Sequence, residues 1–321
     1  MTETTSSEWT GTIDQVILGA TKEEGGTRSC SYRIGGESDL PLLGTVPAGI
    51  RQPLIAFELC DDLHAWPQIV RHYVGDVADD PAAWSALAGK EYGADLIRLY
   101  LTSTHKRGFS DFNAVGTTVA DVLRATSLPI IIEGSNEPDI DSEVFQSCGE
   151  AGQGERLLLG TAEASRYRSI AAAALAYGHS VVAQSPIDIN LAKQLNILLR
   201  ETGLPHDRIV IDPYTGALGY GFEYTYSVME RIRFAALKGD SDLAMPMICS
   251  AFDSLNVKEV RDAEPDLRDD AAVQWEFAAA LAAAVAGSEI VCVRHPKTIP
   301  LLKEALSALN SGVRRAGGES P

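Results

Sequence analysis

The chain has 321 residues, of which 45% are hydrophobic and 22% charged, and its formal net charge is −17. This composition is typical of a globular protein, and the deficit of Lys and Arg argues against a nucleic-acid partner, because phosphate binding needs clustered basic side chains. The five cysteines are scattered and none forms a C-x-x-C pair. We therefore expect neither a four-cysteine iron–sulfur cluster nor a structural zinc in this chain.

Neither end of the chain has the residue order of a signal peptide, and the longest apolar stretch, 277–287, is too short to cross a bilayer. These features predict a cytoplasmic protein without membrane contact. The polar ends, 1–10 and 313–321, are expected to be a disordered segment and a flexible tail.

Residues 1–52 form an N-terminal extension that precedes the regular pattern of strands and helices. It contains two weak strand candidates, QVILGA (15–20) and SYRIGG (31–36). We expect these two segments to pair with each other and to cap the bottom of a barrel.

From residue 53 to residue 312, short apolar runs alternate with helix-like segments, a pattern that favours a parallel sheet. The eight predicted strands span 53–59, 95–101, 129–134, 157–162, 180–185, 208–213, 243–250 and 289–295. The predicted helices span 81–92, 109–125, 163–177, 188–201, 223–237 and 271–286, and Pro300 lies early in a last helix. Eight strand–helix pairs without a linker predict an α/β protein with a single (β/α)₈ TIM barrel.

Such barrels carry their functional groups at the C-terminal ends of the strands. The polar residues at these ends form an acidic, amide-rich ring: Asp61, Asp62, Thr102, Ser103, His105, Glu133, Ser135, Asn136, Thr161, Glu163, Gln184, Ser185, Asp188, Asn190, Asp212, Tyr214, Ser250, Asp253, Arg294 and His295. Structural alternatives remain open. Asp188 directly before a helix also fits an N-cap, and Asp212 before Pro213 also fits a turn.

The sixth predicted strand runs into an unusual loop, IVIDPYTGALGYGFEY (209–224). Its glycines, Gly216, Gly219 and Gly221, lie among aromatic residues, but their order matches neither the dinucleotide fingerprint nor a phosphate-binding P-loop. Glycine lets the backbone approach a flat or anionic group closely, and three glycines exceed what one turn needs. We interpret the loop as a surface for a ligand or a partner.

Several chemistries lack their signatures. No Lys lies in a predicted strand, which argues against a Schiff-base aldolase, and no G-x-S-x-G elbow is present. The six histidines show neither H-E-x-x-H nor H-x-H spacing. We therefore predict no catalytic residue and no metal ligand in this chain.

Long strings of the sequence carry a family resemblance. They are VILGATKEEGGTRS (16–29), KEYGADLIRL (90–99), GERLLLGTAE (154–163), AQSPIDINLAKQLNILL (183–199), IVIDPYTGALGYGFEYTYSVMERIR (209–233) and VRHP (293–296). The chain resembles the small, or delta, subunit of the corrinoid iron–sulfur protein of the acetyl-CoA decarbonylase/synthase system, in the reductive acetyl-CoA (Wood–Ljungdahl) pathway. Three parts depart from the family pattern: Thr161, the end of the third strand with Asn136, EGSNEPDIDSE (133–143), and the segment 251–270, an expected loop.

The resemblance implies a barrel that pairs with a larger, gamma subunit, which holds a [4Fe-4S] cluster and the domain that carries cobalamin. Cobalamin would lie between the two subunits. The complex would accept a methyl group from methyltetrahydrofolate through a methyltransferase and pass it from cobalt to acetyl-CoA synthase, which acts with CO dehydrogenase. The small subunit would then count as a methyltransferase only together with its partner.

The resemblance and the barrel rim together give a set of residues expected to face cobalamin or the partner. They are Asp212, Gly216, Gly219, Tyr220, Gly221, Gln184, Asp188, Asn190, Asn136 and Thr161. The alternative is a stand-alone pterin-binding barrel methyltransferase, in which Asp212 and Asn190 would bind the pterin. A third hypothesis, a sugar-phosphate barrel enzyme, lacks support because the lysine and the phosphate-binding loops of such enzymes are missing.

Overall fold

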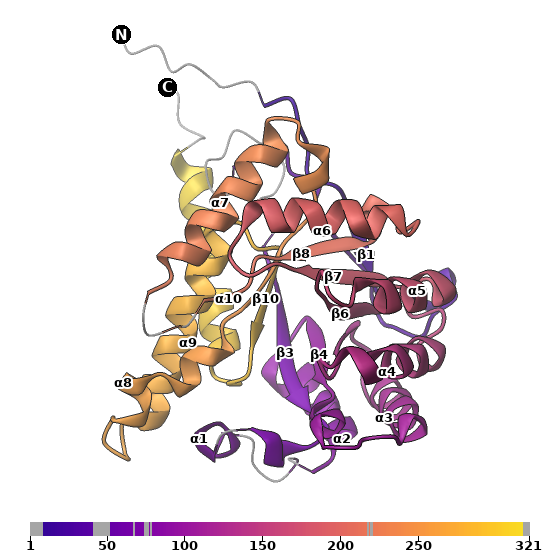
Figure 1. Ribbon diagram of the computed structural model, residues 1–321. Helices are drawn as coiled ribbons and strands as arrows, with labels where there is room; N and C mark the ends of the chain where they lie inside the picture. Colours follow the sequence, from indigo (N-terminus) through magenta and orange to yellow (C-terminus); the bar gives the residue numbers. More distant parts are fainter. Residues whose placement is uncertain are drawn as a thin grey trace.

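The computed structural model describes residues 9–40, 52–66, 68–73, 77, 79–216, 218 and 221–316. Its centre is a sheet of parallel strands surrounded by helices (Figure 1). The eight strands of this sheet lie in the order β8-β7-β6-β5-β4-β3-β10-β9. A parallel bridge between Ile211 and Met247 joins β8 to the segment before β9 and closes the ring. The strands are β3 (Leu54–Cys60), β4 (Leu96–Tyr100), β5 (Ile130–Glu133), β6 (Leu158–Ala162), β7 (Ser180–Gln184), β8 (Ile209–Asp212), β9 (Ile248–Ser250) and β10 (Ile290–Val293).

This arrangement confirms the predicted (β/α)₈ barrel. Each strand is short, apolar and almost completely buried, because its outward residues pack under helices and its inward residues fill the barrel. All eight strands lie within their predicted ranges or extend one residue beyond them. The seventh prediction, 243–250, was too long: its first residue belongs to a 3₁₀ helix, Ser241–Leu243, and β9 begins at Ile248.

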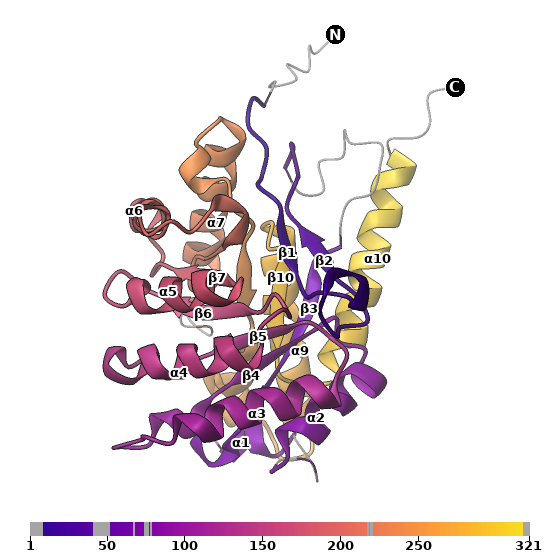
Figure 2. The same ribbon diagram turned by 90° about the vertical axis from the view of Figure 1, so that its right-hand side faces the viewer.

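Helices α3, α4, α5 and α6 stack one beside the next outside the strands (Figure 2). The longer helices are α2 (Pro81–Leu87, continued by the π-helix η4, Ala88–Tyr92), α3 (Phe112–Ala125), α4 (Pro138–Ala151), α5 (Tyr167–Tyr177), α6 (Ile189–Glu201), α7 (Glu223–Leu237), α9 (Arg268–Val285) and α10 (Thr298–Ala316). Short helices are α1 (Gln68–Arg71), α8 (Lys258–Arg261), η1 (Lys22–Glu24), η2 (Leu63–Ala65), η5 (Thr102–His105), η6 (His206–Arg208), η7 (Ser241–Leu243) and η8 (Phe252–Asn256). Among the described residues, no helix combines the length and the apolar character needed to span a membrane.

Helix α4 was not among the predicted helices. Its sequence, PDIDSEVFQSCGEA, is mostly polar, so helical periodicity is faint. Val144, Phe145 and Cys148 are nevertheless fully buried against the barrel, and this packing stabilises the helix. The segment 251–270, expected as a loop, instead forms η8 and α8 before α9 begins.

The N-terminal segment caps the barrel as predicted. Strands β1 (Val16–Leu18) and β2 (Tyr32–Ile34) pair antiparallel. Val16, Leu18 and Ile34 are buried in one cluster with the inward residues at the beginnings of the barrel strands, including Leu96 and Ile131. The hairpin therefore closes the N-terminal end of the barrel interior. Of the predicted disordered segment 1–10 and flexible tail 313–321, residues 1–8 and 317–321 lie outside the described residues, whereas 313–316 form the end of α10.

Candidate functional site

The inward side of the barrel changes from apolar to charged toward its C-terminal end. Because side chains alternate along a strand, residues two positions apart share a face. Ala56 of β3 lies in the apolar cluster, and Glu58 follows on the same face. By the same alternation, Leu96 is followed by Arg98 in β4, and Ile131 by Glu133 in β5. Below, "mouth network" means Glu58, Arg98, Glu133 and Arg294.

Arg98 is the centre of the mouth network. Its Nη2 donates to Oε2 of Glu133 at 2.9 Å, its Nε lies 3.2 Å from Oε2 of Glu58, and its Nη1 donates to Oγ of Ser250 at 2.6 Å. All three charged side chains are buried. Burial lowers the pKa of Arg98, but the carboxylates of Glu133 and Glu58 outweigh it and hold the pKa above its ordinary value. The guanidinium is thus a permanent cation at this end of the barrel.

Arg294, just after β10, is the second cation of the network. Its Nε donates to Oε1 of Glu58 at 2.8 Å. Its guanidinium carbon lies 4.2 Å from the ring centre of Trp66 and 4.0 Å from that of Phe252. Both distances allow a cation–π attraction between Arg294 and the ring. Arg98 also approaches Phe252, at 5.4 Å. The aromatic ring of η8 is thereby held over the mouth network.

Asp212 occupies the same level of the barrel at the end of β8. Its Oδ2 accepts a hydrogen bond from Nε2 of Gln184 at 2.9 Å, and its Oδ1 accepts from the backbone N–H of Tyr214 at 2.9 Å. Burial raises the pKa of Asp212, and the Gln184 hydrogen bond opposes this shift. The structure therefore brings together two predicted site residues, Gln184 and Asp212. The Asp212 carboxylate also fixes the first turn of the loop 213–222 through the backbone of Tyr214.

Thr161 and Asn136 meet beside Glu133. The Thr161 hydroxyl donates to Oε1 of Glu133 at 3.1 Å and lies 3.2 Å from Oδ1 of Asn136. Arg166 donates to the same hydroxyl at 3.3 Å and pairs with the buried Asp141 at 3.1 Å. These contacts connect the ends of β5 and β6 to the mouth network.

The rim of the mouth contains a concentration of left-handed backbone. Asn136, Ile187 and Tyr214 have φ angles of 64°, 51° and 62°, and they follow β5, β7 and β8. A non-glycine residue in this region costs free energy, and such residues cluster at functional sites. Gly221 has a φ of 115°, and a Cβ there would lie 2.0 Å from Oε2 of Glu223. The rim is shaped at some cost to stability, which is typical of a binding surface.

Two further predicted residues, Asp188 and Asn190, lie at the beginning of α6. Asp188 accepts hydrogen bonds from the backbone N–H groups of Asn190 at 2.7 Å and Leu191 at 3.3 Å, so the N-cap alternative is confirmed. Asn190 is exposed in the first turn of α6, and Gly216 donates to Oγ1 of Thr225 at 2.9 Å. Gly219 and Tyr220 lie outside the described residues.

Other members of the predicted ring stabilise the rim itself. Asp61 accepts from the backbone N–H of Ser103 at 2.9 Å. Glu276, on α9, accepts from the backbone N–H groups of Arg294 at 2.7 Å and His295 at 3.0 Å. Burial raises the pKa of Glu276 to about 7, although these hydrogen bonds oppose the shift. The loop after β10 is thus anchored by a carboxylate that titrates near neutrality.

Sequence reasoning missed Glu58, Arg98 and Arg166. It searched the strand ends, whereas Glu58 and Arg98 lie inside strands. The sequence did contain a signal for these two residues. Glu58 is the only charged residue in the apolar run LIAFELC, and Arg98 is the only charged residue in LIRLY. A charge inside a doubly buried strand requires a partner, so a search for complementary charges in neighbouring strands would have found the pair.

The family model described as CO dehydrogenase/acetyl-CoA synthase delta subunit matches residues 15–285. This chain belongs to that family. Among the relatives of this delta-family chain, the acetyl-CoA decarbonylase/synthase complex subunit delta of Archaeoglobus fulgidus is 35% identical, over 95% of this chain and 70% of the relative. Subunit delta 1 of Methanosarcina thermophila is 34% identical, over 94% of this chain and 72% of the relative.

Solved structures similar to this delta-family chain include dihydropteroate synthases. The Yersinia pestis enzyme with a sulfonamide drug has a TM-score of 0.61 and 14% identity, over 83% of this chain and 96% of the enzyme. The Xanthomonas albilineans enzyme in complex with 7,8-dihydropteroate has a TM-score of 0.57 and 17% identity, over 82% and 95%. At this identity the likeness establishes the TIM-barrel fold alone.

Proposed function

We propose that this chain is the barrel subunit of a two-subunit corrinoid methyl carrier. In this proposal, cobalamin lies between the C-terminal mouth of the barrel and a larger gamma subunit that also holds a [4Fe-4S] cluster. The carrier accepts a methyl group from methyltetrahydrofolate through a methyltransferase and passes it to acetyl-CoA synthase in the cytoplasm. The observation that carries the proposal is the match to the delta-subunit family over residues 15–285.

The mouth network supports a scaffolding role. Glu58, Arg98, Glu133 and Arg294 pair with one another, and Phe252 covers the two arginines. These mutual contacts brace the mouth, which suits a subunit whose chemistry takes place on a bound cofactor.

The rim after β8 fits a large flat cofactor or the protein domain that presents it. Tyr224 is 70% exposed and Tyr214 is 45% exposed, and the backbone at Gly221 has no Cβ to hold a neighbour away. Exposed aromatic rings contribute large contact areas to interfaces. When bound, cobalamin supplies the cobalt that carries the methyl group. The residues of this chain would orient the cofactor and exclude water from its edge.

The assembly itself is proposed from the relatives. Their names place them as delta subunits in an acetyl-CoA decarbonylase/synthase complex. We propose the gamma subunit, the methyltetrahydrofolate methyltransferase and CO dehydrogenase/acetyl-CoA synthase as partners of this chain. Co-purification of a tagged chain from its host, with a visible spectrum of the eluate and identification of bound chains by mass, tests this directly. The expected result is corrinoid absorbance with a cysteine-rich larger subunit.

Stand-alone methyltransferase activity on a pterin is the rival function. It is favoured by the buried Asp212 at a strand end, since a pterin ring needs a buried carboxylate, and a solved structure with this fold contains 7,8-dihydropteroate. Against it, both carboxylate oxygens of Asp212 already accept hydrogen bonds from the chain. Methyltetrahydrofolate binding by the isolated, colourless chain, abolished in Asp212→Asn, would establish the rival and overturn the carrier proposal.

A matched glycine pair tests the rim. Gly221→Val places a side chain against Glu223 in the rim, whereas Gly203→Val introduces a similar left-handed strain (φ 97°) after α6, at the other end of the barrel, where the space is open. We expect Gly221→Val to reduce corrinoid content and partner recovery, and Gly203→Val to leave both unchanged. Equal corrinoid content in the two variants would contradict the placement of the cofactor.

A further inference from the structure

Asp212 differs from most other buried carboxylates of the chain because it has no cationic partner. In the described residues six carboxylates are buried: Glu58, Glu133, Asp141, Glu155, Asp212 and Glu276. The first four of these lie within 3.2 Å of an arginine nitrogen. A charge in a protein interior is unfavourable unless it is paired, so the two carboxylates without an arginine require a physical explanation.

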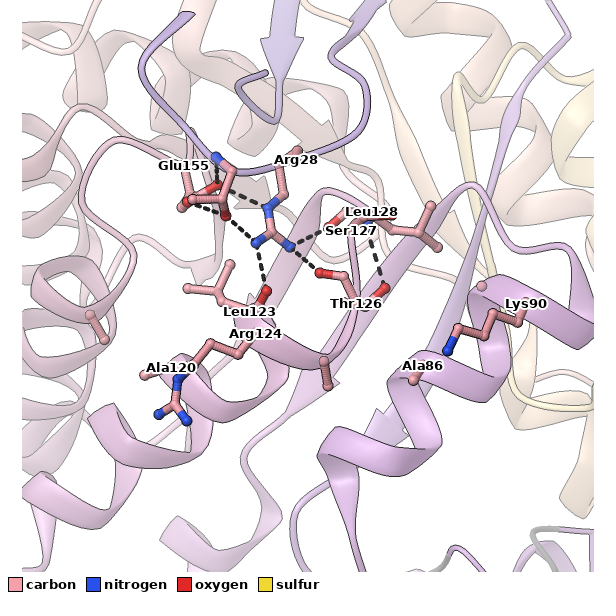
Figure 3. A pocket seen from close by; sticks show the side chains of 14 residues that line it. Arg28, Ala86, Lys90, Ala120, Leu123, Arg124, Thr126, Ser127, Leu128 and Glu155 are labelled. Atoms are coloured by element: carbon pink, nitrogen blue, oxygen red, sulfur yellow. Dashed lines mark hydrogen bonds and ion pairs between the residues drawn. The ribbon is translucent and has the colours of Figure 1, made fainter. Parts of the chain in front are cut away.

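The pair of Arg28 and Glu155 shows how a buried charge is compensated elsewhere in the molecule (Figure 3). This pair lines a cavity of about 680 Å³ near the beginnings of β5 and β6. Nε of Arg28 donates to Oε2 of Glu155 at 2.9 Å, and its Nη1 and Nη2 donate at 2.6 Å to the carbonyls of Thr126 and Leu123. The guanidinium and the carboxylate neutralise each other, so this pair adds no net charge.

Glu276 lacks an arginine partner but is bound by three donors. Its carboxylate accepts from the backbone N–H groups of Arg294 at 2.7 Å and His295 at 3.0 Å, and from the hydroxyl of Thr298 at 2.6 Å. Glu276 belongs to helix α9, outside the strands. Its charge therefore serves the loop after β10 and does not face the barrel interior.

Asp212, in contrast, faces the barrel interior, because it lies two residues after Val210 of the inner apolar cluster. It is 4% exposed and forms no ion pair within the described part of the chain. Its two hydrogen bonds come from neutral groups, the Gln184 amide and the backbone N–H of Tyr214. Burial raises the pKa of Asp212, so a positive charge brought close to the mouth would stabilise the ionised carboxylate. Tyr214 is 45% exposed, which places this carboxylate just beneath the rim.

The charged groups of the mouth therefore do not balance. Two arginines lie among three carboxylates: Arg98, Arg294, Glu58, Glu133 and Asp212. Both arginines pair with the glutamates, so the excess negative charge belongs to Asp212. Charges buried in a protein are screened less than exposed ones, and their field extends further. The excess charge thus acts on any group that lies over the mouth.

We propose that the charge of Asp212 lowers the Co(II)/Co(I) reduction potential of the corrinoid. The inference rests on the proposed carrier function, in which the cofactor lies over the mouth. Co(II) and the corrin ring together carry one positive charge, whereas Co(I) and the ring are neutral. A nearby carboxylate therefore stabilises the oxidised member of the couple. The electron added in this couple would come from the [4Fe-4S] cluster proposed for the larger subunit.

Redox titration of the two-subunit complex, followed by the visible spectrum of the corrinoid, tests this effect. Asp212→Asn removes the charge and keeps the shape of the side chain, and the Gln184 amide can turn to keep its hydrogen bond. We expect the equilibrium constant for reduction to rise about tenfold, which is a rise of about 59 mV in the midpoint potential of a one-electron couple. Two unit charges roughly 12 Å apart, at an effective dielectric constant of about 20, produce an effect of this size.

Two control variants separate charge from structural disturbance. Arg294→Gln removes a cation while Glu58 keeps Arg98 as a partner, so the midpoint potential should fall. Asp121→Asn, on the outside of α3, removes a carboxylate whose side chain is 44% exposed and pairs with Arg124. Because solvent screens this charge, Asp121→Asn should leave the potential unchanged.

A second variant keeps the test decisive if Asp212→Asn does not retain the corrinoid. Glu133→Gln removes another carboxylate of the mouth, leaves Arg98 paired with Glu58, and should also raise the potential. Equal potentials for the wild type and these neutral variants, in complexes that contain the corrinoid, would overturn this inference and leave the carrier proposal intact. A wild-type complex without any corrinoid would overturn the carrier proposal and this inference with it.

Discussion

The two ends of the barrel interior are built from the same strands but by different chemistry. At the N-terminal end, apolar residues pack beneath the β1–β2 hairpin. At the C-terminal end, two residues further along the same strands, a buried network of two arginines and two glutamates fills the space. Apolar packing adds stability without fixing a geometry, whereas buried ion pairs yield little net stability after desolvation but strongly penalise any unpaired arrangement. The comparison separates a stabilising end from a shape-defining end.

The largest effect is expected at the shape-defining end. Arg98→Met removes the cation that Glu58 and Glu133 share, and it leaves Glu133 buried without a cationic partner. Breaking a buried pair in this way costs about 3–5 kcal/mol of unfolding free energy. Urea denaturation measures this loss of unfolding free energy. The control is Arg124→Met at an exposed position, which should change the free energy of unfolding by less than about 0.5 kcal/mol. A loss below about 1 kcal/mol in Arg98→Met would mean that the network is solvated.

A somewhat smaller loss is expected at the stabilising end. Leu18 of β1 is buried in the hairpin cap, so Leu18→Ala removes apolar contacts and leaves a cavity, at a cost of about 3 kcal/mol. We expect the folded Leu18→Ala variant to retain its full corrinoid content and partner recovery. This result would show that the N-terminal end of the barrel contributes stability without shaping the mouth. Loss of the corrinoid from folded Leu18→Ala complex would show that the two ends are coupled.

A pH effect comes next in size. The pKa of Glu276 is about 7 in the folded chain against an ordinary value of 4.5, so the folded state binds more protons between these values. The free energy of unfolding therefore falls as pH rises through this window. The wild type should lose about 2 kcal/mol more than Glu276→Gln between about pH 5 and pH 7. Parallel pH profiles for the two proteins, from urea denaturation, would contradict the assigned pKa.

The smallest effect on stability is expected on the rim. Tyr224 is 70% exposed, so Tyr224→Ser should change the free energy of unfolding by less than about 0.5 kcal/mol. Its recovery of the larger subunit should nevertheless fall severalfold, because an exposed aromatic side chain at an interface contributes strongly to binding. Leu175→Ser, on the outside of α5 near the N-terminal end of the barrel, is the matched control and should recover the partner normally. Similar recovery by both variants would remove this tyrosine from the interface.

Local signals explain how much of the molecule could be predicted. The strand β5 could be found because IIIE is apolar, branched and bounded by Pro129 and Gly134. Helix α4 could not, since its apolar residues are few and only tertiary contacts of Phe145 stabilise it. In the candidate site, Gln184 and Asp212 were predictable as strand ends.

The sequence by itself determined the barrel, its N-terminal cap and the family, because apolar periodicity, turn residues and long shared strings are properties of consecutive residues. Only the tertiary structure decided which charges meet at the mouth. Glu58 and Arg294 are 236 positions apart in the chain, yet their side chains lie within 2.8 Å. That contact exists because β10 pairs with β3 when the sheet closes on itself, and closure depends on all eight strands together.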